Sequence, residues 1–185
     1  SESMTACNVP FELLDASEIM RRWPQWKLRD DVVGIFQAES GIAPAARCNA
    51  AHLRMAAAHG ATLLDKTPIR SVRAVNGEYE VVTDAATFRC AKLVIAAGAW
   101  SNQIYNSFDF QLPLTVTQEQ VTYFTPLNSS RFTPERFPIW IWMDEPSFYG
   151  FPIYGEAAIK VAQDVGGHEV TADTRSFEPD DAALQ

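Results

Sequence analysis

With 185 residues, 47% of them hydrophobic, the chain is long enough to bury a core and too apolar to be wholly disordered. Its formal charge of −8 at pH 7 argues against a nucleic-acid partner, because phosphate binding needs a basic surface and the 15 Lys and Arg residues are scattered. No apolar run approaches the length of a membrane span, so we expect no membrane association.

The first elements are predicted from local signals. Asp15 and Glu18 have the spacing of a capping box and open a short helix over residues 16–22. The apolar run 32–38 predicts a strand. A proline at the start and a glycine at the end then bound a helix over residues 45–59.

After this helix the apolar period falls to about 2, which is typical of strands. Asn76-Gly77 is a strong hairpin signal, and it lies within a predicted three-stranded meander. The strands predicted in this part of the chain cover residues 61–65, 69–75, 78–84, 86–90 and 92–96. A glycine turn and a short helix follow the last of them, so residues 45–106 are typical of part of a parallel α/β unit.

From Pro113 onward the pattern predicts antiparallel strands over residues 113–126, 138–145, 147–152 and 157–164. The predicted fold class is therefore α+β, a mixed α/β protein with an antiparallel sheet and a partial α/β unit.

The three cysteines, Cys7, Cys48 and Cys90, are an odd and widely spaced set. This fits reduced thiols in a cytoplasmic protein better than a disulfide framework. Cys48, His52 and His59 share one predicted helix, but two turns separate His59 from the others, so we expect no metal site. Neither a nucleophile elbow nor a catalytic triad is evident.

Two strands carry candidate site residues. Alternation places Trp140 and Trp142 on one face and the neighbouring aliphatic residues on the other, so the tryptophans either line a cavity or cover the sheet. On its own face of the predicted strand Lys160 lies between Ala158 and Ala162, which leaves room for a flat ligand, but an exposed lysine on an edge strand is the commoner explanation. The turn in "IAAGAW" either approaches a nucleotide or merely joins a strand to a helix.

Five blocks in the same order resemble the FAD-dependent amino-acid oxidase superfamily, D-amino-acid and glycine oxidase-like, in its sarcosine oxidase and N-methyltryptophan oxidase branch. They are "LLDASEIMRRWPQW", "ESGIAPAARCNAAHLRMAAAHGATLLDKTPI", "LVIAAGAWSNQI", "LPLTVTQEQVTYF" and "FYGFPIYGEAAIKVAQDVGG". The resemblance covers nearly the whole chain and implies the cofactor FAD.

The resemblance also implies a division into domains. Residues 1–43 and 108–185 would belong to a substrate domain, and residues 44–107 to an FAD domain. The Gly-x-Gly-x-x-Gly fingerprint of dinucleotide binding is absent from these 185 residues. The chain thus resembles an internal fragment, and we expect it to be inactive alone, unable to hold FAD, and prone to self-association through uncovered apolar faces.

Roles follow from matched positions. Lys160 matches the family lysine that lies over the flavin and activates oxygen, where a fixed cation stabilises developing negative charge. Tyr149 matches a residue of the substrate pocket, and Trp140 falls at the pocket wall. The segments expected to touch the cofactor contain Ile69, Ala96, Ala97, Gly98 and Trp100.

There are two departures from the branch. Asp164 stands beside the expected substrate where relatives have a histidine, and Gln118 replaces a common arginine. A carboxylate there favours a cationic amine and puts sarcosine itself in doubt.

The expected reaction is oxidation of the C–N bond of a small secondary or primary amine, or an N-methyl amino acid, to an imine, with O2 reduced to H2O2. Two alternatives stay open: a flavin dehydrogenase that uses another electron acceptor, and a non-catalytic binding or assembly domain.

Overall fold

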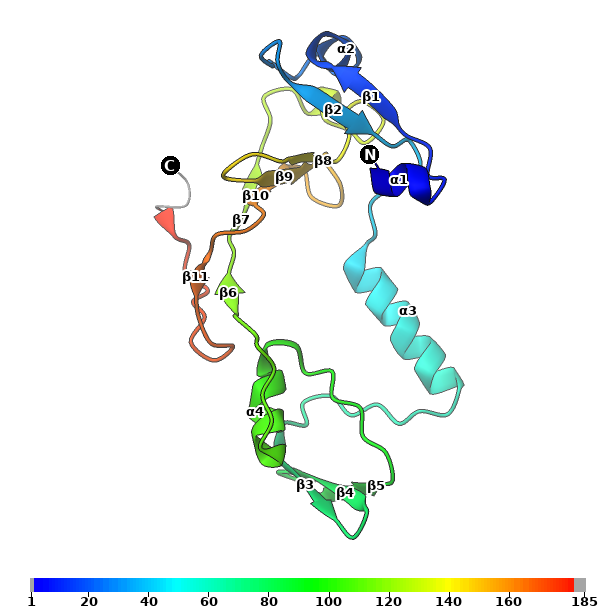
Figure 1. The fold of residues 1–185 in the computed structure, drawn as a ribbon, viewed down its shortest axis with the longest axis vertical. Coiled ribbons are helices and arrows are strands. Elements are labelled where there is room, and N and C mark those ends of the chain that lie inside the picture. Colours follow the sequence, from blue (N-terminus) through cyan, green and yellow to red (C-terminus); the bar gives the residue numbers. More distant parts are fainter. Residues whose placement is uncertain (1, 182–185) are drawn as a thin grey trace. The chain divides into compact units, whose positions relative to one another are not determined.

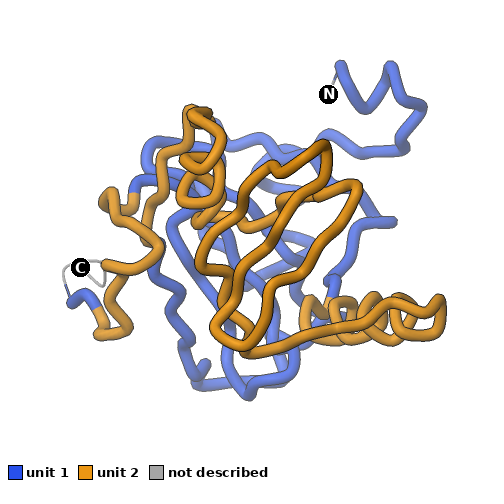
Figure 2. Tube along the Cα trace, turned by 90° about the horizontal axis from the view of Figure 1, so that it is seen from below, with its two compact units in different colours: residues 1–43, 119–166, 180–185 blue, residues 44–118, 167–179 orange. Residues whose placement is uncertain are grey.

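The structure is a computed structural model, and it describes residues 2–181. The chain forms two compact units (Figure 2). Unit 1 comprises residues 1–43, 119–166 and 180–185, and unit 2 comprises residues 44–118 and 167–179. Unit 2 therefore extends beyond the predicted range 44–107 and takes up a later segment. Every strand pairing in the described part is antiparallel, and the mixture of helices with antiparallel sheets confirms the predicted fold class (Figure 1).

Unit 1 begins with α1 (Glu2–Ala6), β1 (Glu12–Asp15), α2 (Ala16–Arg22) and β2 (Val33–Phe36). The Asp15 carboxylate caps α2 by accepting a hydrogen bond from the Glu18 backbone N–H at 2.8 Å, which confirms the predicted helix start. Strands β1 and β2 pair with each other, and Ile19 of α2 packs against Gly34 of β2. This small layer buries Leu14, Ala16 and Ile19.

The main sheet of unit 1 has four strands in the order β7 (Val121–Phe124), β10 (Ile159–Gln163), β9 (Phe148–Phe151) and β8 (Trp140–Trp142). A short 3-10 turn, η3 (Ser129–Arg131), lies between β7 and β8. Because β10 pairs with β7 on one side and β9 on the other, it is a central strand. The register places Lys160 opposite Phe151 and Tyr123, and Ala162 opposite Tyr149.

One face of this sheet packs on aromatic residues. Trp140 meets Trp26 edge-on with ring centroids 5.2 Å apart, and Trp26 stacks on Phe137 at 5.6 Å. Ile141, on the other side of β8, is 65% exposed, and Met143, which directly follows β8, is 90% exposed. Trp140 therefore fills the space against Trp26, while Ile141 on the other side of the strand stays exposed.

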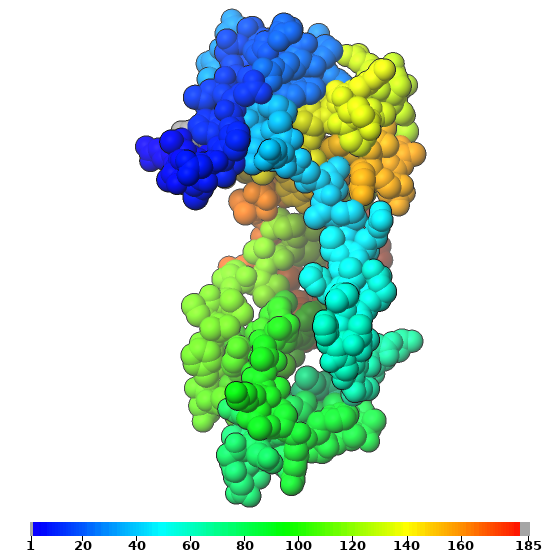
Figure 3. Space-filling model, turned by 90° about the vertical axis from the view of Figure 1, so that its right-hand side faces the viewer, coloured from blue at the N-terminus to red at the C-terminus, as the bar shows by residue number. Residues whose placement is uncertain are grey.

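Unit 2 begins with α3 (Ala45–Ala58), which confirms the predicted helix. None of its residues is buried, and Figure 3 shows the atoms of this helix, in cyan, at the surface. The meander that follows consists of β3 (Ile69–Val75), β4 (Glu78–Thr83) and β5 (Thr87–Cys90). Asn76 and Gly77 turn with φ of 53° and 83°, as a type I′ hairpin requires, so the predicted turn is confirmed.

A buried carboxylate holds the meander together. Glu80 is 5% exposed and accepts hydrogen bonds from Arg73 and Arg89 in the two flanking strands, at 2.6 and 2.7 Å. These hydrogen bonds, from Arg73 first, lower the pKa of the Glu80 carboxyl. The cross-strand triplet explains how a charge is buried in so small a sheet.

The remaining elements of unit 2 are short. They are η1 (Gly98–Trp100), α4 (Ser101–Tyr105), η2 (Asn106–Phe108), β6 (Thr117–Gln118) and β11 (His168–Glu169), with β6 paired to β11.

Two predicted strands, residues 61–65 and 92–96, are not strands in the structure. Both runs have the residue pattern of a strand. In the described part, however, neither pairs with a neighbouring strand through backbone hydrogen bonds. The expected parallel pairing is consequently absent from residues 2–181. Within those residues no helix is long and apolar enough to cross a membrane.

Candidate functional site

Lys160 lies in the middle of the four-stranded sheet. It is half-buried on β10, between β7 and β9, so the explanation of an exposed lysine on an edge strand does not hold. A lysine at such a position is unusual, because a central strand leaves its ammonium group fewer routes to water.

The ammonium group of Lys160 lies over two aromatic rings. Its Nζ is 4.9 Å from the ring centroid of Phe151 and 5.4 Å from that of Tyr149. The two rings are nearly perpendicular, at 84°, with centroids 6.0 Å apart, so they form a corner around the cation. The salt bridges in the described part all involve arginines, and Lys160 takes part in none of them.

Tyr149 and Asp164 are placed differently relative to Lys160. Tyr149 shares its face of the sheet, as the ring contact shows. Asp164 follows β10 and donates its backbone N–H to the Ser147 carbonyl at 2.9 Å, which continues the same register. Alternation puts Asp164 on the Lys160 face, but four residues of strand separate the two by about 13 Å. The structure therefore joins Tyr149 to Lys160 and leaves Asp164 exposed, farther along the same face.

Trp140 is not brought together with these residues. It pairs with Gly150, whereas Ile141 pairs with Tyr149, so Trp140 lies on the opposite face of the sheet from Tyr149 and Lys160. Sequence reasoning instead missed Phe151. Its signal was present, because Phe151 follows Tyr149 by two residues and must share its face in a strand.

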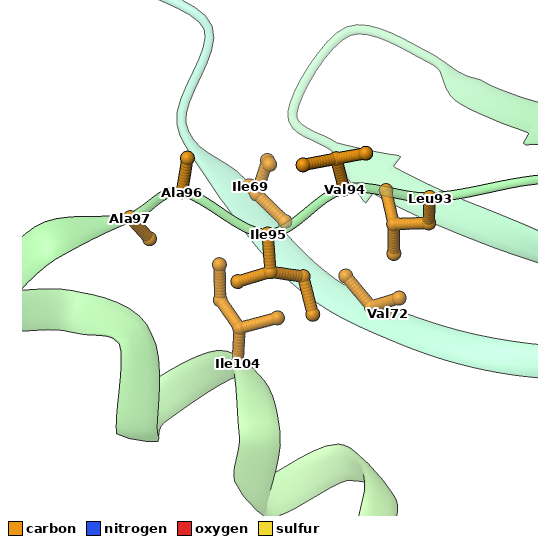
Figure 4. A pocket seen from close by; sticks show the side chains of 8 residues that line it. All are labelled: Ile69, Val72, Leu93, Val94, Ile95, Ala96, Ala97 and Ile104. Carbon is orange, nitrogen blue, oxygen red and sulfur yellow. The ribbon is translucent and has the colours of Figure 1, made fainter. Parts of the chain in front are cut away.

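Three of the predicted cofactor residues border one apolar hollow in unit 2 (Figure 4). The hollow has a volume of about 200 Å³ and is lined by Ile69, Val72, Leu93, Val94, Ile95, Ala96, Ala97 and Ile104. Figure 4 shows Leu93 and Ile95 directed toward Val72 and Ile104, from an extended segment that crosses β3. None of these side chains carries a polar atom, so they offer only apolar contacts to a bound group.

Gly98 and Trp100 form the turn that follows this hollow. Gly98 has a φ of 55°, a left-handed value that favours glycine. The indole N–H of Trp100 donates to Asp173 at 3.2 Å, and the Gln103 side chain donates to the same carboxylate at 2.7 Å. These two hydrogen bonds, from Trp100 first, lower the pKa of Asp173.

Arg175 completes this arrangement, since its guanidinium carbon lies 5.2 Å from the centroid of the Trp100 ring. Trp100 is thus held on both its edge and its face. No sequence pattern pointed to Asp173 or Arg175, because they are about 70 residues away in the chain.

Gln118 has a structural explanation. Its amide nitrogen donates to the Ser176 carbonyl at 3.0 Å, and its oxygen accepts from the Ser176 backbone N–H at 2.8 Å. Both ends of the side chain are therefore used to hold the segment after β11. Among the described residues, no group of three His, Cys, Asp or Glu side chains converges to hold a metal ion.

Comparison with protein families gives one match over almost the whole chain. The model described as "FAD dependent oxidoreductase" matches residues 2–185. Among curated proteins, the chain is 27% identical over 191 residues to monomeric sarcosine oxidase of Bacillus sp. (strain NS-129), covering 99% of this chain and 49% of that protein. It is 33% identical to the Streptomyces avermitilis enzyme of the same name, covering 81% of this chain and 39% of that protein.

A third relative is N-methyl-L-tryptophan oxidase of Salmonella heidelberg, at 25% identity over 87% of this chain and 42% of that protein. The chain thus spans about half the length of the curated relatives it matches, or less.

Solved structures agree in fold. NikD, described as an unusual amino acid oxidase essential for nikkomycin biosynthesis, superposes in its open form with a TM-score of 0.83 at 23% identity, over 99% of this chain and 48% of NikD. L-proline dehydrogenase from P. horikoshii gives 0.81 at 19% identity, over 99% of this chain and 47% of that protein. At these identities the likeness concerns the fold alone.

Proposed function

The chain belongs to the FAD-dependent oxidoreductase family. From this premise we propose that it is part of an oxidase that acts on the C–N bond of a small secondary or primary amine. The curated relatives are named for the oxidation of sarcosine and of N-methyl-L-tryptophan, both of which are N-methylated amino acids. When bound, FAD would take the hydride from the carbon beside the nitrogen, giving an imine, and pass the electrons to O2 as H2O2.

Within unit 1, Lys160 fits the ring of the flavin, because it offers a cation to a ring that gains negative charge on reduction. Within unit 2, the hollow around Ile95 is apolar. The Gly-x-Gly-x-x-Gly turn that would cradle the phosphates is absent from the 185 residues. Ile69, Ala96, Ala97, Gly98 and Trp100 would therefore contact the cofactor through shape and main chain.

The observation that carries the proposal is the position of Lys160. Its ammonium group is held over two rings on a central strand, and in the described part it forms no salt bridge. A fixed positive charge stabilises negative charge that develops beside it, and it does so without reorganising at the moment of reaction. We assign to Lys160 the activation of oxygen.

The other site residues have narrower roles. Tyr149 would form a wall of the amine pocket next to Lys160, and Asp164 would favour a cationic amine farther along the same face. Trp140 has no support as a wall of that pocket, because it lies on the other face of the sheet. We propose unit 1 as the substrate unit and unit 2 as the FAD unit.

Because we expect the 185 residues alone not to hold FAD, replacing Lys160 by Met tests the proposal in a longer, FAD-loaded protein that contains this chain together with a dinucleotide-binding segment. Stopped-flow measurements should show flavin reduction by sarcosine or N-methyl-L-tryptophan at a nearly unchanged rate. Reoxidation by O2 should slow by about 10²- to 10³-fold, because one preorganised electrostatic contact is lost. Lys27→Met, which removes an exposed lysine elsewhere, is the matched control.

The same experiment separates the alternatives. A dehydrogenase would reduce a dye acceptor rapidly and would respond little to the loss of Lys160. A non-catalytic domain would show no flavin reduction by any amine with the wild-type protein.

A further inference from the structure

We propose that Phe151, together with Tyr149, positions the Lys160 ammonium group as an unneutralised cation, which makes Phe151 a positioning residue of the site. This inference rests on the function proposed above for Lys160. The juxtaposition that carries it is a corner of two perpendicular rings around one Nζ atom.

The register of the sheet builds this corner. Phe151 lies directly opposite Lys160, and Tyr149 lies two residues earlier on the same face. Directly opposite residues of antiparallel strands have their Cβ atoms about 5 Å apart, and diagonal neighbours remain within reach of an aromatic side chain. Phe151 therefore contacts the lysine as its direct partner, and Tyr149 contacts it as the diagonal one.

Ala162 permits the diagonal contact. It is the direct partner of Tyr149 and is 5% exposed, so the smallest chiral side chain stands in the place where a larger one would push the phenol away. Ala162 thus leaves space for the ring of Tyr149, a role that the sequence pattern alone did not suggest.

Rings and carboxylates hold a lysine with different consequences. A carboxylate would cancel most of the field of the ammonium group at short range. An aromatic face attracts the cation through its quadrupole and leaves the net charge of +1 in place. The nearest acidic residue on the same face by register, Asp164, lies four residues along the strand, too far for a salt bridge. The corner therefore fixes the position of the charge and preserves its strength.

Fluorinated phenylalanines at Phe151 test the contact without changing its shape. Each fluorine weakens the negative potential of the ring face, so the rate of flavin reoxidation by O2 in the longer, FAD-loaded protein should fall stepwise with fluorine number. With three fluorines we expect a total loss of about 3- to 10-fold, on the scale of a cation–π contact. The rate of flavin reduction by the amine should stay within about twofold, which a general packing defect would not allow.

A spectroscopic measurement on the 185-residue chain requires neither flavin nor turnover. The chain has four lysines, so ¹³C-lysine labelling gives few signals, and Lys160→Met assigns one of them. The ε-methylene protons of Lys160 should be displaced upfield by the ring currents of Phe151 and Tyr149. Phe151→Leu should remove much of this displacement, whereas Phe151→Tyr should retain it.

Phe124→Leu is the matched control, because Phe124 is an exposed aromatic residue of β7 whose strand partner is Ile159 rather than Lys160. It should change neither the reoxidation rate nor the lysine spectrum.

Two results would overturn the inference. One is a reoxidation rate that does not depend on fluorine number, and the other is a Lys160 signal that is identical in the wild type and in Phe151→Leu. If Lys160→Met leaves reoxidation unchanged, the function proposed for Lys160 fails separately, and the spectrum still decides whether the rings hold the ammonium group.

Discussion

Gly150 packs closely against Trp140 in the four-stranded sheet. Gly150 is buried on β9, and a Cβ atom built there would lie 2.5 Å from the indole ring of Trp140. Its backbone has no left-handed φ, so the requirement for glycine is one of space. The same contact keeps Trp140 flat on the strand and leaves the opposite face to Tyr149 and Phe151.

Gly150→Ala should therefore destabilise the protein through overpacking. The indole is a large side chain against Trp26 and has little room to move, so we expect a loss of about 1–3 kcal/mol in the free energy of unfolding. Urea denaturation followed by tryptophan fluorescence measures it. Gly41→Ala is the control, since nothing lies within 4 Å of a Cβ atom at that position. Equal stability of the two variants would contradict the packing argument.

At the scale of elements, local signals predicted what local interactions determine. The cap of α2 and the Asn76-Gly77 hairpin depend on residues within four positions of each other, and both are confirmed. Residues 61–65 and 92–96 were predicted as strands and are not, because a strand also needs a hydrogen-bonding partner that no local pattern supplies. Alternation likewise separated Trp140 from Ile141 correctly but could not decide which side of the strand would be covered.

In the candidate site, too, the pairing of residues between strands could not be predicted from local signals. Lys160 and Tyr149 were identified from the resemblance, but their pairing required the register across the loop 152–158. A slip of one residue would have placed them on opposite faces. Phe151 was within reach of sequence reasoning once that register was known.

Helix α2 gives a prediction for pH dependence. Hydrogen bonds from Arg21, and then from Arg22, lower the pKa of Glu18 from 4.5 to about 2. Because the folded-state pKa lies below the unfolded one, the contribution of Glu18 to stability is complete above about pH 4.5 and is lost as the pH falls toward 2. Glu18→Gln should therefore flatten the decline of the urea midpoint over this range.

Glu156→Gln serves as the comparison, because Glu156 forms no salt bridge within the described residues. If the urea midpoint falls equally steeply with decreasing pH in the wild type and in Glu18→Gln, the two arginines contribute nothing measurable to stability through Glu18.

At the scale of the whole molecule, little apolar surface is buried. The structure exposes 14151 Å². A compact monomer of 20.6 kDa would expose roughly 8,900 Å², and two separate units of half that mass roughly 10,700 Å² in total, by the usual scaling of area with mass. The exposed area exceeds even the value for two separate units. Val94, Val33 and Leu13, at 88%, 79% and 69% exposed, are examples of side chains left uncovered.

We therefore expect the 185-residue chain, purified by itself, to bind a dye such as ANS and to associate in size-exclusion chromatography as its concentration rises. It should also lack the visible absorbance of flavin, because its residues provide no cradle for the pyrophosphate. Addition of free FAD should not restore that absorbance after gel filtration. A yellow, monomeric and dye-negative preparation would contradict both expectations.

The two units share the chain in an interleaved order, with crossings at residues 43–44, 118–119, 166–167 and 179–180. Neither unit can consequently be cut from the gene as one continuous stretch. A protease that nicks the chain between residues 118 and 119 would leave each unit built from pieces of both products. Such products should stay together under native conditions and separate only on denaturation. Only nine residues, 164–172, separate β10, which carries Lys160 in unit 1, from Asp173, which accepts a hydrogen bond from Trp100 in unit 2.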